Sequence, residues 1–345
     1  MEFRVTPAPH REPRTSITKT MRRVLLALLP AAIAYVAFFG WGLVINIVIG
    51  GCVALAAEAA CLRLRRYPVG IHLRDGSALV TTVLLAFAMP PLAPWWLMTI
   101  GVLIAIVLAK QVYGGLGLNP FNPAMVAYVA LLVSFPLQMT TWLPPVMGDL
   151  DYPHLGFLAT LEYSLFGRLP PGLTLDAITG ATPLDMLKTG LGGMQTIAEI
   201  RVSPLFGDFG GRGWEWINSF IGIGGLYLLY AGVIRWQIPT AMLGTLFGVA
   251  TLMYIVDPSR FPSPVFHLFT GAAMLGAFFI ATDPVSAATT DRGRLIFGAG
   301  VGLLTYVIRT WGGYPDGVSF AVLLMNLCVP LIDRFTHPRV YGTKL

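Results

Sequence analysis

Residues 43–61, LVINIVIGGCVALAAEAAC, form an apolar run in which Glu58 is the one charged side chain. The hydrocarbon core of a bilayer is about 30 Å thick, and a helix of roughly 20 apolar residues crosses it. A chain in lipid must also pair its own backbone N–H and C=O groups, which a helix does within a single segment. The run therefore predicts a transmembrane helix.

Similar runs recur along all 345 residues, of which 55% are hydrophobic and 12% charged. Soluble proteins are about 25% charged. We expect an all-α membrane protein with about ten transmembrane helices, because the runs lack the alternation of barrel strands. The predicted spans are 24–41, 43–61, 78–89, 95–109, 124–144, 214–234, 239–256, 264–281, 295–308 and 318–332.

The distribution of basic residues predicts the orientation. Ten crossings from a cytoplasmic N-terminus place seventeen of the 23 Lys and Arg residues inside and six outside, which obeys the positive-inside rule. We expect the tails 1–22 and 334–345 to be cytoplasmic and the long connection 145–213 to face the periplasm or exterior. The formal net charge of +6 then requires no nucleic-acid partner.

The chain also contains an internal repeat. Residues 72–78, HLRDGSA, align with 267–273, HLFTGAA, at an offset of 195, and 113–115, YGG, align with 311–313, WGG, at an offset of 198. Two five-helix halves, 23–144 and 214–333, are predicted, and the odd number of spans inserts the second half upside down. A single Pro or Gly cluster could be ordinary loop punctuation, but matched breaks in both halves of an inverted repeat favour a shared site that they line. These breaks are 88–91, 119–123, 282–284 and 312–315.

Three cysteines and one glutamate lie in or at the edge of the predicted spans. Cys52, Cys61 and Cys328 show no C-x-x-C pairing, so we expect small core residues rather than a disulfide, an iron–sulfur cluster or another metal site. Glu58 is either an ion or proton ligand within the membrane or a side chain that snorkels to Arg63 or Arg65.

The exterior connection contains DAITGATPLD, residues 176–185. Thr182 before Pro183, with Asp185 three places after the Thr, is typical of a helix N-cap with an approximate capping box, so a helix is predicted through 186–188. Gly180 would give the preceding turn its freedom in φ. On physical grounds alone this structural interpretation is the stronger one.

The same residues resemble a flavin attachment motif. Thr179, Gly180, Ala181 and Thr182 are similar to the (S/T)-G-A-T sequence of the NqrB/RnfD family, at which FMN is joined to threonine through a phosphoester. The full motif often has Ser or Thr where this chain has Asp185. The segments 75–80, DGSALV, 117–124, GLNPFNPA, and 281–286, ATDPVS, also resemble this family, and in length the chain is more like its RnfD members.

The resemblance implies a flavin-carrying subunit of a bacterial inner-membrane complex, Rnf, that passes electrons between reduced ferredoxin and NAD, coupled to Na⁺ or H⁺ movement. Thr182 would carry covalent FMN, installed by an exported flavin transferase, and Gly180 and Ala181 would leave room for it. No residue of this chain is expected to be catalytic alone. The sequence has no NAD fingerprint and no cluster ligands, so those sites would belong to other subunits of the complex.

The family is also associated with a second, non-covalent flavin, such as riboflavin, in the membrane part. Candidate polar contacts at the repeat interface are Asn119, Asn122, Thr282 and Asp283, although Asp283 could equally cap a helix. The alternative function is a transporter or channel on the same inverted repeat with no redox role. Fold alone does not separate the two, whereas the T-G-A-T sequence favours the flavoprotein.

Overall fold

The computed structural model describes residues 16–146 and 153–337. Within them the regular elements are helices, and extended pairing is limited to two isolated bridges, Trp142 with Gly180 and Phe206 with Gly211. The expected all-α class is confirmed for these residues. The helices are α1 (Ile17–Phe39), α2 (Gly42–Leu64), α3 (Val69–Leu73), α4 (Ser77–Ala88), α5 (Trp95–Leu103), η1 (Ile104–Gln111), α6 (Pro123–Ser134), α7 (Pro136–Thr140), α8 (Phe157–Phe166), α9 (Leu175–Ile178), α10 (Pro183–Gly192), α11 (Ile197–Ile200), α12 (Trp214–Tyr230), α13 (Gln237–Val256), α14 (Pro264–Phe269), α15 (Ala273–Leu275), η2 (Gly276–Ile280), α16 (Asp291–Trp311) and α17 (Val318–Thr336).

Four described helices, α1, α2, α13 and α17, are long and apolar enough to cross a bilayer. The other six predicted spans fall on helices or consecutive helical segments that are shorter, broken or, like α16, more charged. Leu26, Ile33 and Ile255 are 61%, 64% and 71% exposed, whereas the charged Glu58 and Lys110 are each 2% exposed. This distribution reverses that of a soluble protein and identifies a multi-pass membrane protein.

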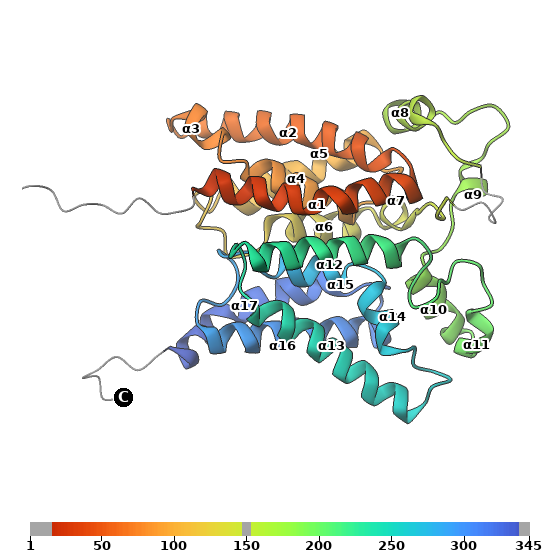
Figure 1. Cartoon of the computed structure of the whole chain (residues 1–345). Helices are drawn as coiled ribbons and strands as arrows, with labels where there is room; N and C mark the ends of the chain where they lie inside the picture. Colours follow the sequence, from red (N-terminus) through yellow and green to blue (C-terminus); the bar gives the residue numbers. More distant parts are fainter. Residues whose placement is uncertain (1–15, 147–152, 338–345) are drawn as a thin grey trace, which may run out of the picture.

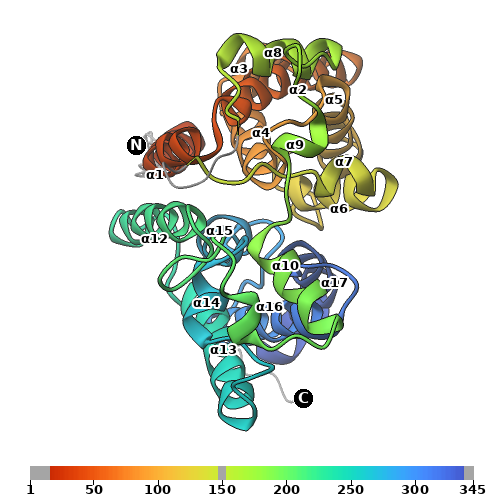
Figure 2. The ribbon, with the colours of Figure 1, turned by 90° about the vertical axis from the view of Figure 1, so that its right-hand side faces the viewer.

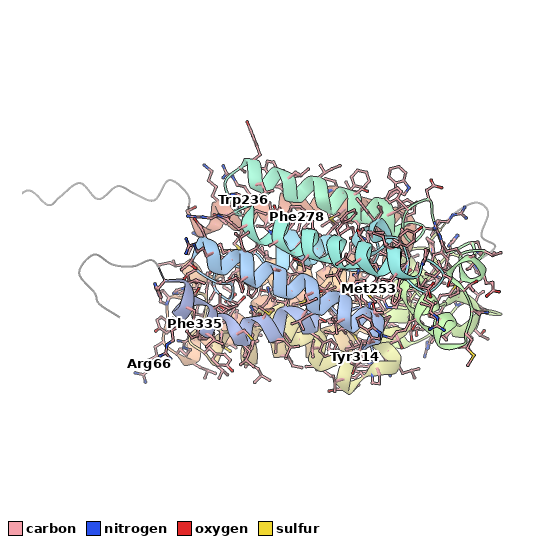
Figure 3. The ribbon with its side chains drawn as sticks, turned by 90° about the horizontal axis from the view of Figure 1, so that it is seen from below. Arg66, Trp236, Met253, Phe278, Tyr314 and Phe335 are labelled. Atoms are coloured by element: carbon pink, nitrogen blue, oxygen red, sulfur yellow. The ribbon has the colours of Figure 1, made fainter. Side chains whose placement is uncertain are left out.

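The long helices run side by side, so the molecule has two ends (Figure 1). The first turn of α1, helix α3 and the last turn of α17 lie at one end, here called the inner end. Helices α8 to α11 lie at the other, the outer end. The side chains of Arg66 and Phe335 lie toward the inner end, and those of Met253 and Tyr314 toward the outer end (Figure 3). The long connection is thus helical in part, and its apolar helix α8 is one that the sequence patterns did not predict.

Seen from the outer end, the helices form two groups, α1 to α7 and α12 to α17 (Figure 2). The groups meet where α1 packs against α12 and α6 against α17. At the first contact, a Cβ atom added to Gly224 would overlap the Ala27 carbonyl oxygen. Small residues allow this close backbone approach between helices in membranes.

The aligned repeat segments both break a helix. Gly76 separates α3 from α4 with φ +81°, and Gly271 separates α14 from α15 with φ +68°. Only Gly adopts such values at little cost. At each break a carboxylate accepts a hydrogen bond from a backbone N–H group: Asp75 Oδ1 accepts from Ser77 at 2.7 Å, and Asp316 Oδ2 accepts from Ala272 at 2.7 Å. The first break lies at the inner end and the second at the outer end.

The three cysteines are free thiols. Cys52 and Cys328 are exposed on the outside of the bundle, and Cys61 is half-buried. The expectation of small core residues is therefore wrong for Cys52 and Cys328, because an apolar run in a membrane helix has a lipid-facing side as well as a core side.

The contact between α1 and α12 gives a test of the packing. Gly224→Ala should lower the free energy of unfolding of the purified chain by about 1–3 kcal/mol, the usual cost of overpacking a close contact. Its midpoint of thermal unfolding should fall accordingly. Gly222→Ala in the same helix is the matched control, because its Cβ would meet only Met274 Sδ at 3.9 Å. Thermal unfolding followed by size-exclusion chromatography in detergent measures both, and equal stability of the two variants would contradict the close crossing.

Candidate functional site

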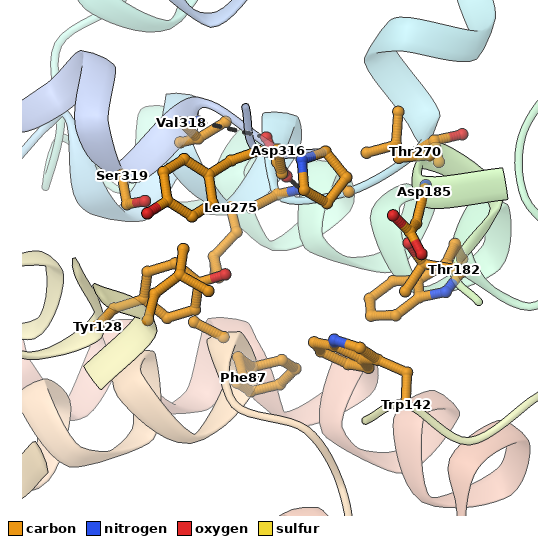
Figure 4. Close-up of a pocket in the computed structure, with 18 of the residues that line it drawn as sticks. Phe87, Tyr128, Trp142, Thr182, Asp185, Thr270, Leu275, Asp316, Val318 and Ser319 are labelled. Atoms are coloured by element: carbon orange, nitrogen blue, oxygen red, sulfur yellow. Dashed lines mark hydrogen bonds between the residues drawn. The ribbon is translucent and has the colours of Figure 1, made fainter. Parts of the chain in front are cut away.

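Thr182 caps α10 at the outer end of the molecule. Its Oγ1 accepts a hydrogen bond from the N–H group of Asp185 at 3.2 Å, and Pro183 opens the helix. The predicted N-cap is confirmed, and the helix continues to Gly192, beyond the predicted turn. Among the described residues, Asp185 does not return the hydrogen bond to Thr182, so only half of the predicted capping box forms. The Asp185 side chain instead lines the outer cavity described below (Figure 4).

The residues before Thr182 are held by backbone contacts. Thr179 Oγ1 donates to the Leu175 carbonyl at 2.8 Å, and the Gly180 N–H group donates to the Trp142 carbonyl at 2.9 Å. Gly180 does not have a positive φ, so the predicted freedom of the turn is wrong. A Cβ atom at Gly180 would meet no heavy atom within 4 Å, and Ala181 is exposed. The motif thus has open space beside it.

Lys188 fastens α10 to the second half. Its Nζ donates to the carbonyls of Ile308 and Arg309, each at 3.3 Å, and of Tyr314 at 2.8 Å. The carbonyls at a helix C-terminus lack partners within the helix, and the last turn of α16 obtains one here. Burial lowers the pKa of the Lys188 ammonium, and the nearby Asp185 carboxylate partly opposes this shift. The lysine therefore fixes the helix that begins at Thr182.

A cavity of about 120 Å³, here called the outer cavity, opens beside Thr182 between the two halves. Phe87 and Tyr128 line it from the first half, and Leu275, Asp316 and Ser319 line it from the second (Figure 4). The other lining residues include Trp142, Asp185, Trp214, Asn218, Thr270 and Tyr314. Its wall is mostly apolar and aromatic with a few polar groups, which is typical of a cofactor site.

Trp142 and Trp214 line one side of the outer cavity, and two rings of α1 that do not line it pack against Trp214. The ring of Trp142 lies 5.3 Å from that of Trp214, which lies 4.9 Å from Phe39 and 6.1 Å from Tyr35. Each pair is inclined rather than face to face, a favourable arrangement for aromatic groups. These rings come from α1, α12 and the segment before the exterior connection, so the cavity exists only when the halves are assembled.

Asn218 contributes a buried acceptor to the outer cavity. Its Nδ2 group donates to the carbonyls of Trp214, Phe269 and Gly271 at 3.0–3.2 Å, which fixes the amide and closes the break before α15. Its Oδ1 atom is buried and has no hydrogen-bond partner among the described residues. An unpaired buried acceptor costs about 1–3 kcal/mol, so a ligand N–H group would be favourable here.

A second cavity, also of about 120 Å³, lies between the halves toward the inner end and is here called the inner cavity. It brings Asn119, Asn122, Thr282 and Asp283 into one wall. Asn122 caps α6 and donates through Nδ2 to the Ile280 carbonyl of η2 at 3.3 Å, which joins the halves. The four residues proposed from sequence thus meet across the interface.

Asp283 is half-buried in a turn rather than at the start of a helix. Its Oδ1 accepts from the Val285 N–H group at 3.2 Å, and its Oδ2 accepts from Ser286 Oγ at 2.9 Å. The alternative of a helix cap is therefore wrong, since α16 begins at Asp291 and is capped by Thr290.

Glu58 forms a buried ion pair beside the inner cavity. Its Oε1 accepts from Lys110 Nζ at 2.5 Å and from Gln111 Nε2 at 3.1 Å. Arg65 instead donates to Gln111 Oε1 at 2.9 Å. The alternative that Glu58 snorkels to Arg63 or Arg65 is wrong, because η1 brings a cation closer than the arginines of its own helix.

Comparisons with known proteins identify the family of this chain. A model of the NQR2, RnfD, RnfE family matches residues 4–342. The chain is 50% identical over 351 residues to the D subunit of the ion-translocating oxidoreductase complex of Aliivibrio salmonicida, covering 100% of this chain and 99% of the relative. Proteins of the same description are 51% identical in Pectobacterium carotovorum, covering 100% of both chains, and 49% identical in Escherichia coli, covering 100% of this chain and 99% of the relative. The chain belongs to the NQR2, RnfD, RnfE family, which confirms the resemblance drawn from its motifs.

The fastening of α10 is open to direct measurement. Lys188→Met should make the backbone amides of α10 exchange hydrogen roughly tenfold faster, because it removes the donor that joins α10 to three carbonyls at and beyond the end of α16. Lys188→Arg is the matched control and should stay nearer the wild type, since it keeps a charged donor. Hydrogen–deuterium exchange mass spectrometry of the peptides covering α10 makes the comparison, and unchanged exchange in Lys188→Met would show that α10 is held by other contacts.

Proposed function

We propose that this chain is the flavin-carrying membrane subunit of an ion-translocating oxidoreductase complex, with FMN joined to Thr182 through a phosphoester. The observation that supports this most directly is the position of Thr182. Thr182 lines a largely apolar and aromatic cavity, beside open space at Gly180, and caps a helix held by Lys188. The full-length relatives, whose names place them in such a complex as its D subunit, support the same assignment.

The residues of the outer cavity suit a flavin. FMN, when bound, supplies one- and two-electron redox chemistry, and the protein's role is to bind and orient it. Thr182 would anchor the phosphate at the N-terminus of α10, where free N–H groups and the helix dipole favour an anion. Trp142 and Trp214 offer aromatic faces to the ring system, and the unpaired Asn218 Oδ1 offers an acceptor for a ring N–H group. The Asp185 carboxylate partly opposes the phosphate charge.

The inner cavity is proposed to hold a second, non-covalent flavin such as riboflavin. Asn119, Asn122, Thr282 and Asp283 bring amide, hydroxyl and carboxylate groups to its wall, and these are partners for a polyhydroxyl chain and a flavin ring. Phe278 and Phe279 of η2 add apolar surface. With one cavity near each end of the interface, a flavin would lie toward each side of the membrane and could carry electrons there.

The proposed topology is ten crossings in two inverted five-helix repeats, in a bacterial inner membrane. Both termini would be cytoplasmic and 145–213 periplasmic, where an exported flavin transferase reaches Thr182. The matched breaks at Gly76 and Gly271, at opposite ends of the bundle, support the inversion. Other subunits would exchange electrons with ferredoxin and NAD, and electron flow would be coupled to Na⁺ or H⁺ movement. The exposed apolar side chains face the lipid bilayer and neighbouring subunits.

The flavin anchor is tested by one substitution. Thr182→Val keeps the size and β-branching but removes the oxygen that would carry the phosphate. The wild-type band on a denaturing gel should fluoresce, because a phosphoester survives denaturation, and the Thr182→Val band should be dark. The variant should still insert and fold, since losing one cap costs about 1 kcal/mol.

Thr179→Val is the matched control, because it removes only the hydrogen bond to the Leu175 carbonyl. It should keep at least part of the fluorescence. A fluorescent Thr182→Val band would move the attachment elsewhere. A dark wild-type band from cells that express the transferase would favour a transporter without a redox role.

The orientation is tested with single cysteines in a chain whose Cys52, Cys61 and Cys328 are changed to Ser. A cysteine at the exposed Asp176 should react with a membrane-impermeant maleimide added to intact spheroplasts, because the positive-inside rule places the outer end in the periplasm. A cysteine at the exposed Arg292, at the inner end, should react only after the membrane is opened. Labelling in the reverse pattern would contradict both the orientation and the access of the transferase.

A further inference from the structure

The buried ion pair between Glu58 and Lys110 is more elaborate than packing requires. Both side chains are 3% exposed, inside the span of a membrane protein. Burying two charges costs several kcal/mol for each ion, and good geometry only offsets this cost. Ionisable groups within membrane segments accordingly tend to mark ion pathways. The pair therefore calls for a functional explanation.

Lys110 Nζ lies among oxygen atoms from two elements. It donates to Glu58 Oε1 of α2 and to Ser77 Oγ of α4, the latter at 2.7 Å. Ser77 Oγ in turn donates to Asp75 Oδ1 at 2.6 Å. The ammonium thus has two side-chain oxygen partners, and hydrogen bonds lead from Glu58 through Lys110 and Ser77 to Asp75, which is half-exposed at the inner end.

The second oxygen of Glu58 is an independent observation. Glu58 Oε2 is buried and has no hydrogen-bond partner among the described residues. A carboxylate oxygen carries high negative charge, so leaving it unpaired in the interior is costly. A ligand able to contact Oε2 as well as Oε1 would satisfy it, and that ligand must be a cation or a donor.

The local backbone places both partners of Glu58 on one turn. Lys110 and Gln111 are consecutive and both reach Glu58 Oε1 from η1, which is π-helical. Segments of π-helix are rare and are frequent at functional sites. The charged groups around the pair are Asp75, through Ser77, and Arg65, through Gln111, while Asp283 lies across the inner cavity.

We propose that Glu58, together with Ser77, forms a binding site for a monovalent metal cation of the Na⁺ type, and that the Lys110 ammonium is its built-in competitor. The cation and the ammonium carry the same charge and both take oxygen ligands, so each satisfies the carboxylate in the absence of the other. Lys110 and Ser77 also line the inner cavity, which gives the lysine side chain room to move when the cation binds. The role of this site in ion coupling rests on the proposed function, whereas the site itself rests on the geometry.

Removing the competitor tests the site. The probe is ²²Na⁺, bound to the purified full-length chain carrying Thr182→Val, so that the result does not depend on covalent FMN. Lys110→Met should bind Na⁺ roughly tenfold or more tightly than the parent chain, because apparent affinity rises when the binding-competent state no longer has to displace a competitor. Lys110→Met combined with Glu58→Gln should lose this binding.

Arg63→Met is the matched control, because it removes an exposed charge from the same end of α2 but leaves Glu58, Ser77, Lys110 and the hydrogen bond between Arg65 and Gln111 in place. It should bind Na⁺ like the parent chain. If Lys110→Met does not fold, Lys110→Gln keeps a neutral donor to Glu58 and should show the same gain. Equal Na⁺ binding by the Lys110 variants with and without Glu58→Gln, or no Na⁺ binding by either, would overturn the site while leaving the flavin proposal untouched.

Discussion

Backbone polar groups that leave a helix within the membrane must be paired by other parts of the protein, since lipid offers them no partner. The chain breaks helices at Gly76 and at Gly271, and side chains from elsewhere pair the freed groups. Asp75 serves the first break, and Asn218 and Asp316 serve the second. Arg309 then ties Asp316 to the His267 carbonyl before the second break. Irregular backbone is thereby shielded inside the bundle, where it can shape a site without being exposed to lipid.

Both cavities lie at the contact between the two halves. Each cavity takes its walls from both groups of helices, and the groups touch through a close crossing of α1 on α12 at Gly224. The outer cavity receives Thr182 from a helix that is fixed by Lys188, and the inner cavity receives Asn122 and Asp283 from opposite halves. The shape of either cavity therefore depends on how firmly the halves are assembled.

Much of the architecture follows from local sequence signals. Apolar runs locate the helices, and Thr182 with Pro183 locates the start of α10, because these signals act within a few residues. Matched breaks also bring Asn119, Asn122, Thr282 and Asp283 to one interface, as the repeat predicts. Contacts between distant segments carry no such signal. The reach of Lys188 to the end of α16, the pairing of Glu58 with Lys110 and the free acceptor of Asn218 depend on tertiary packing. The prediction that the turn uses the conformational freedom of Gly180 was wrong, because its φ is not positive. The position instead has open space beside it.

The proposed attachment of a flavin to Thr182, which lines the outer cavity, can be tested without any variant. The sample is the proteolytic peptide that contains residues 176–185, prepared from membranes of cells that express the transferase, and the method is tandem mass spectrometry. We expect a mass increase equal to one FMN less one water, with fragment ions that assign it to Thr182 rather than to Thr179. An unmodified peptide, or the same mass increase on another residue, would contradict covalent attachment at Thr182.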